Sequence, residues 1–167
     1  ALVSGDLETA REYALLRDPL LQGDTSKGIN RTTSRNAVKL AFIEQQRGRN
    51  ATATELLTQT LPVLRGMPRL GTFGFGIRDV QIYALLGRKE EALAAFRDAI
   101  DAGYRGSLLF DGWPLFADPY IDSIRDDPRF LAMLDELDGY LALMRDRLLE
   151  AEANDNLAGL RAAAGTI

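Results

Sequence analysis

The chain has 167 residues, 46% of them hydrophobic, which suits one domain of ordinary size with a packed core. It contains no Cys and no His, which excludes disulfides, thiolate or imidazole metal ligands, and Cys or His nucleophiles and bases. The formal net charge of −4 argues against a nucleic-acid surface. No apolar run approaches the ~20 residues that a membrane span needs. The charge is distributed unevenly. Residues 1–80 carry 11 basic and 8 acidic side chains, whereas residues 81–167 carry 9 basic and 16 acidic ones.

A glycine followed five residues later by an alanine opens three helical runs along the chain. The pairs are Gly5 and Ala10, Gly48 and Ala53, and Gly87 and Ala92. Glycine tolerates the positive φ of a sharp turn after a helix, and alanine lets two helices approach closely. The pattern therefore predicts stacked helix–turn–helix units and an all-α fold.

The predicted helices follow from apolar periodicity and from their end signals. Asp118-Pro119 and Asp127-Pro128 each place an N-cap Asp before a Pro at the first helical position. A long loop is expected over Gly66–Phe73. The helices are expected over 8–17, 32–47, 77–86, 90–100 and 119–126, and over a longer stretch that begins at residue 128.

The third unit carries a resemblance to a known family. Its apolar residues Leu93, Phe96 and Ile100 share one helical stripe. The unit has an aromatic before the turn, then Gly, Ala, an aromatic and Ala, and this pattern resembles the core of a tetratricopeptide (TPR) unit. The matching residues are Tyr83, Gly87, Ala92, Phe96 and Ala99. The second unit matches more loosely through Leu40, Ala41, Gly48, Ala53 and Leu57.

The run from Trp113 to Phe130 resembles the end of TPR regions in bacterial multidomain regulators. Such regions follow a nucleotide-cyclase, winged-helix DNA-binding or kinase domain. The resemblance implies a non-catalytic protein-interaction or regulatory module of a signalling protein, with a protein or peptide partner and no cofactor. The compartment stays open between the cytoplasm, which is favoured, and the periplasm. A small-molecule sensor with Trp113, Phe116 and Tyr120 around a pocket is an alternative.

The expected architecture is an α-solenoid of degenerate TPR-like hairpins, closed by a long C-terminal helix. It covers residues 1–152 with a truncated first repeat, and 153–167 form a frayed tail. The repeats are degenerate because the glycines lie 43 and 39 residues apart, against ~34 in a regular TPR. The glycines of Gly71–Gly76 lack the Lys and Ser/Thr of a phosphate loop and indicate a turn between repeats.

Basic residues recur on one face of the predicted helix 32–47, where Arg35 and Lys39 follow Arg31 at intervals of four. In the TPR pattern the first helix of each unit lines a concave groove. Carried over through Gly48 and Gly87, the groove positions are Arg35, Lys39, Phe42, Gln45, Arg78 and Gln81. Cations beside amides suit an extended peptide with acidic character. The alternative for the basic stripe is a solvated face.

The last helix carries apolar residues at alternating spacings of four and three, as in the seam of a coiled coil. They are Phe130, Leu134, Leu137, Leu141, Met144, Leu148 and Ala151. A capping helix packed on the last repeat and a helical homodimer interface both explain this pattern. The dimer hypothesis uses Leu134, Leu137, Leu141, Met144 and Leu148, and makes the chain a structural dimerisation element.

Overall fold

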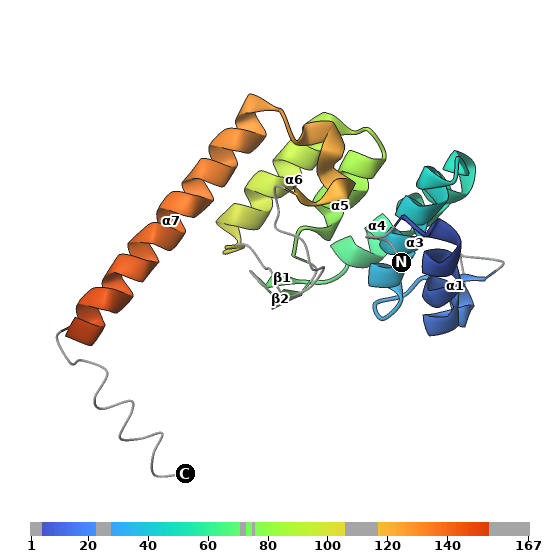
Figure 1. Ribbon diagram of the computed structural model, residues 1–167, viewed down its shortest axis with the longest axis horizontal. Helices are drawn as coiled ribbons and strands as arrows, with labels where there is room; N and C mark the ends of the chain where they lie inside the picture. Colours follow the sequence, from blue (N-terminus) through green and yellow to red (C-terminus); the bar gives the residue numbers. More distant parts are fainter. Residues whose placement is uncertain (1–4, 23–27, 71–72, 75, 106–116, 154–167) are drawn as a thin grey trace, which may run out of the picture.

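The computed structural model describes residues 5–22, 28–70, 73–74, 76–105 and 117–153 (Figure 1). The all-α prediction is confirmed for these residues, whose strands β1 (Arg69–Leu70) and β2 (Phe73–Gly74) span two residues each. The α-helices are α1 (Leu7–Arg17), α3 (Ser34–Gln46), α4 (Asn50–Arg65), α5 (Arg78–Leu85), α6 (Lys89–Asp101) and α7 (Pro128–Ala153). Short 3₁₀ helices η1 (Pro19–Leu21) and η3 (Pro119–Ile124) complete the described elements.

One backbone turn joins the helices of each complete hairpin. Gly48 ends α3 with a φ of 77°, and Gly87 ends α5 with a φ of 72°. The residue after each glycine donates its N–H back to the carbonyl five positions earlier, at 2.8 Å in both turns. This hydrogen bond belongs to the Schellman motif, whose left-handed residue is usually Gly. The next helix begins two residues after each glycine. Gly5 has a similar φ of 75° ahead of α1.

The alanines of the repeat register lie where the sequence pattern places them. Ala53 and Ala92 are fully buried, and Ala10 is 7% exposed. Ala53 lies on α4, which packs against α3, and Ala92 lies on α6, which packs against α5. The helical runs are therefore arranged as repeating units, which gives the chain a repeat-like helical architecture.

Two hydrophobic cores hold the units together. The first contains buried side chains of α1, η1, α3 and α4, with Ile82 of α5. The second contains side chains of α5, α6, η3 and the first turns of α7, with Phe96 and Phe130 in ring contact at 5.1 Å between centroids. Leu61 of α4 packs against both cores. Leu61 therefore links the two cores, and Figure 1 shows the helices from α1 to α7 that they hold.

Three of the ion pairs between helices of different units share the same sequence separation. Glu8 pairs with Arg47 at 2.5 Å, Glu90 with Arg129 at 2.8 Å, and Arg97 with Glu136 at 2.6 Å. Each pair spans 39 residues. A separation of 39 residues equals the distance between Gly48 and Gly87 along the chain.

The structure differs from the sequence-based expectations in two places. Residues within the predicted loop Gly66–Phe73 contribute to a ladder in which Arg69 pairs with Gly74 and Leu70 with Phe73. The helix expected over 119–126 is a 3₁₀ helix with a non-helical φ/ψ at Ile121. Its N-cap is as predicted, because the Asp118 side chain accepts the Tyr120 N–H at 2.9 Å. Trp113, Phe116 and the tail after Ala153 lie outside the described residues.

Candidate functional site: the face of the first helices and the end of α7

A basic hollow lies at the start of α3. Arg35 and Lys39, two of the predicted groove residues, are half-buried there. The hollow measures about 190 Å³, and its lining comprises Arg17, Asp18, Thr32, Arg35, Asn36 and Lys39. Three cations therefore surround one small depression whose described lining contains a single carboxylate. Arg31, the first member of the basic stripe, is exposed and does not line the hollow.

Hydrogen bonds fix the backbone around this hollow. The Asn30 N–H bonds the Thr33 hydroxyl at 3.0 Å, and the Thr33 N–H bonds the Asn30 side-chain oxygen at 3.2 Å. Reciprocal bonds of this kind fix the chain direction just ahead of a helix. The Asn36 side chain donates to the Ala14 carbonyl near the end of α1 at 2.7 Å. Arg35 and Lys39 therefore project from a helix start that is held to α1.

The other predicted groove residues hold neighbouring helices together. Phe42 is buried, and its ring meets Tyr120 of η3 edge to face at 4.7 Å. Gln45 donates to the Leu85 carbonyl of α5 at 2.8 Å. Gln81 is buried and donates to the Asp118 carboxylate at 2.6 Å.

The predicted groove residues therefore fall into two groups. Arg35 and Lys39 line the hollow, whereas Phe42, Gln45 and Gln81 connect α3, α5 and η3. Arg78 is half-buried at the first residue of α5. Tyr120, the described member of the aromatic trio considered for a small-molecule pocket, packs on Phe42.

A buried carboxylate with three arginines is a feature that the sequence reasoning missed. The Glu44 side chain is 2% exposed and pairs with Arg11 at 2.6 Å, with Arg47 at 3.5 Å and with Arg49 at 3.6 Å. The arginines come from α1, from the end of α3 and from the residue after Gly48. Because cations near a helix C-terminus complement the helix dipole, the cluster also stabilises the end of α3. Arg47 and Arg49 beside Gly48 were the available signal in the sequence.

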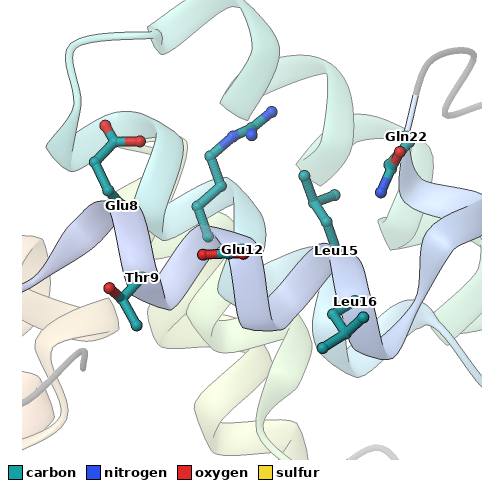
Figure 2. A pocket seen from close by; sticks show the side chains of 7 residues that line it. Glu8, Thr9, Glu12, Leu15, Leu16 and Gln22 are labelled. Atoms are coloured by element: carbon teal, nitrogen blue, oxygen red, sulfur yellow. The ribbon is translucent and has the colours of Figure 1, made fainter.

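Two adjoining hollows lie beside α1, and the second of them also borders α3 and α4. One, of about 360 Å³, is drawn in Figure 2, and its lining comprises Glu8, Thr9, Arg11, Glu12, Leu15, Leu16 and Gln22. The second, of about 380 Å³, shares Arg11, Leu15 and Gln22 and reaches Glu44 and Thr52. Tyr13 and Leu16 of α1 are 64% and 72% exposed. Tyr13 corresponds in the repeat register to Leu56 of α4, which is fully buried.

The predicted seam of α7 divides into a covered and an uncovered part. Phe130 and Leu137 are buried in the second core, and Leu134 is half-buried against it. The seam residues Leu141, Met144 and Leu148 are 42%, 45% and 53% exposed. Figure 1 shows the C-terminal part of α7 extending beyond the other helices. The capping role and an exposed apolar face therefore belong to different parts of the same helix.

Two buried aspartates have opposite electrostatic environments. Burial raises the pKa of Asp79 above its usual value, although its Arg69 ion pair and a hydrogen bond from the Val80 N–H act against this. Hydrogen bonds from Arg129 and Lys89 hold the pKa of Asp127 well below its usual value. The distances are 3.0 Å to Arg129 and 2.9 Å to Lys89. Asp79 is thus poorly compensated as an anion, and Asp127 is well compensated.

Within the described part of the chain, no cluster of acidic side chains is arranged to hold a metal ion. In the same residues, no helix is both long enough and apolar enough to cross a membrane. Comparisons with protein-family models, with curated proteins and with solved structures gave no match.

Proposed function

We propose that the chain is a TPR-like, non-catalytic interaction module, a part of a bacterial multidomain signalling or transcriptional regulator. Two observations support the family assignment. The turns at Gly48 and Gly87 share their hydrogen-bonding pattern, and the alanine five residues after each glycine is fully buried. Helical hairpins that stack in this way form extended binding surfaces.

The partner that we propose is a protein segment with acidic side chains, bound at the hollow beside α3. The observation that carries this proposal is the placement of Arg17, Arg35 and Lys39 around one depression of about 190 Å³. Arg35 and Lys39 are half-buried, and hydrogen bonds to charged groups contribute about 1.5–3 kcal/mol when they are shielded from water. Their existing interactions within the chain would be exchanged for bonds to the carboxylates of the partner. Arg78, the first residue of α5, is a further cation among the predicted groove positions.

The test is binding of a fluorescent Glu-rich peptide, with an otherwise identical Gln-rich peptide as its control. The expected result is binding of the Glu-rich peptide that weakens as salt is added, since salt screens the attraction. Arg35→Ala and Lys39→Ala should each weaken it about 10-fold, because a factor of ten corresponds to about 1.4 kcal/mol. Arg78→Ala should have a smaller effect.

Arg31→Ala is the matched control, since it removes a cation next to α3 from an exposed position outside the hollow. It should leave the affinity within about two-fold of wild type. Equal affinity of the wild type and the Arg35→Ala variant, without salt dependence, would show that the basic stripe is a solvated face.

A further inference from the structure

We propose that the exposed part of α7 pairs with the same part of a second copy of the chain, as two antiparallel helices that cross between Ala142 and Leu143. The proposal is independent of the peptide site at α3. It starts from Leu141, Met144 and Leu148, whose side chains are 42–53% exposed. Contiguous exposed apolar side chains on a domain mark an interaction site.

The uncovered seam continues a face that is already used for packing. Leu137 is buried in the second core, and Leu141, Met144 and Leu148 continue its spacing of four, three and four. Apolar residues at alternating spacings of four and three are the pattern by which one helix packs along another. An isolated helical segment of this length is only marginally stable in water. The occupant that the spacing fits is therefore a helix with the same period, which the second copy supplies.

The position of the domain selects the antiparallel direction. The domain covers the seam side of α7 from Phe130 to Leu137. Two parallel helices about 8–10 Å apart would bring both domains to the same end and into the same space. Antiparallel helices place the domains at opposite ends. A crossing between Ala142 and Leu143 pairs Leu141 with Met144, and the helices diverge beyond it because Leu148 would otherwise meet Leu137 of the second copy, which that copy's own domain covers.

Charged side chains at the seam edge select the register. When Leu141 lies opposite Met144 of the second copy, Asp138 of each helix lies beside Arg145 of the other. The next register, with Met144 opposite Leu148, would instead bring the two Arg145 side chains together and place Asp138 beside Glu152. Opposite charges at the edge of a helical seam favour a pairing and like charges oppose it. The crossing between Ala142 and Leu143 is the register with attractive charges.

The first experiment is sedimentation equilibrium of the purified chain. The wild type is expected to form dimers, and Leu141→Asp should raise the dimer dissociation constant at least about 10-fold. Leu143→Asp is the matched control, because Leu143 is 47% exposed on the same helix but lies off the seam. Far-UV circular dichroism should show that both variants stay folded. A wild type that is monomeric up to its solubility limit, or a Leu141→Asp variant that dimerises as well as wild type, would overturn the proposal.

The second experiment tests the register with charge reversal. Asp138→Arg and Arg145→Asp should each weaken the dimer several-fold, and the double variant should restore it, because the pair is then reversed but still attractive. In the competing register Asp138→Arg would strengthen the dimer through Glu152. A stronger dimer in that variant, or a double variant weaker than both single ones, would exclude the proposed crossing.

Disulfide formation gives an independent check, since the chain contains no Cys. A mixture of Leu141→Cys and Met144→Cys chains should oxidise to the mixed disulfide dimer in preference to either homodimer. Parallel helices would instead crosslink each variant with itself, and this outcome would contradict the antiparallel arrangement.

Discussion

The hairpins α3–α4 and α5–α6 turn in the same way but bury different charges. At Gly48 and Gly87 the backbone has nearly the same φ and the same pair of hydrogen bonds. The first hairpin buries Glu44 among three arginines. The second buries Asp79, for which the structure gives one ion pair, to Arg69. Glu44 lies in the last turn of its helix, and Asp79 lies in the first turn of its own.

This difference separates two roles of the sequence. The Gly and Ala positions set the backbone of a unit, and they are repeated because both hairpins need the same turn and the same close helix contact. The buried charges connect a unit to its surroundings, and they vary because each unit has different neighbours. We therefore expect substitutions at the shared positions to have similar effects in both hairpins, and substitutions at the buried charges to have different ones.

The largest effect is expected from Glu44→Gln. The substitution keeps the shape but leaves the three arginines without their shared carboxylate. Removing one partner of a buried ion pair typically costs 3–5 kcal/mol. Because Arg11 and Arg49 are 35% and 50% exposed and water can solvate them, we expect about 3 kcal/mol. Urea unfolding measures it, with the exposed Glu55→Gln of α4 as control. An unchanged unfolding midpoint would mean that the cluster adds no stability.

Overpacking the contact between the helices should destabilise both hairpins to a similar degree. Ala53→Leu and Ala92→Leu each add three carbons at a position with no exposed surface, which typically costs about 1–3 kcal/mol. Ala94→Leu, on the exposed side of α6, is the matched control and should change the free energy of unfolding by less than about 0.5 kcal/mol. Unchanged thermal stability of both buried variants would show that the repeat register is wrong.

A glycine comparison isolates the cost of the turn from that of packing. No atom lies within 4 Å of a Cβ added at Gly48 or Gly87, so alanine there meets only the strain of positive φ. Gly48→Ala and Gly87→Ala should each lower the free energy of unfolding by about 1 kcal/mol. Gly139→Ala, inside α7 and equally open, should raise it by about 0.5–1 kcal/mol. Thermal unfolding of the three variants would contradict this explanation if all shifts had one sign.

The repeat register could be predicted because it is local. A glycine, a buried alanine and an apolar period fix a helical hairpin, and Ala53, Ala92 and Phe96 are buried as that pattern requires. The Glu44 cluster could not be predicted, since Arg11 lies 33 residues away along the chain and meets Glu44 only after α1 packs on α3. The predicted groove residues include some that line a hollow and some that bond to other helices, and the sequence could not separate them because their partners are also distant along the chain. Gln81 meets Asp118 across 37 residues, and one helix alone does not reveal that partner.

The smallest expected effect is on how the free energy of unfolding depends on pH. Asp79 and Asp127 should contribute to this dependence with opposite signs. A raised pKa means that the folded state binds the proton of Asp79 more readily than the unfolded state does. As pH rises from about 3.8 through the raised pKa, ionisation therefore lowers the free energy of unfolding. The stability of wild type relative to Asp79→Asn should fall across this window.

Asp127 should behave in the opposite way, because Arg129 and Lys89 lower its pKa. Its stabilising contribution is complete above the unfolded pKa of about 3.8 and is lost as pH falls toward the lower pKa of the folded state. The stability of wild type relative to Asp127→Asn should therefore rise between about pH 2 and pH 4. Urea titrations of the three proteins across this range measure both differences. Two differences with the same slope would mean that burial of Asp79 does not outweigh its ion pair with Arg69, and that the two buried aspartates are electrostatically equivalent.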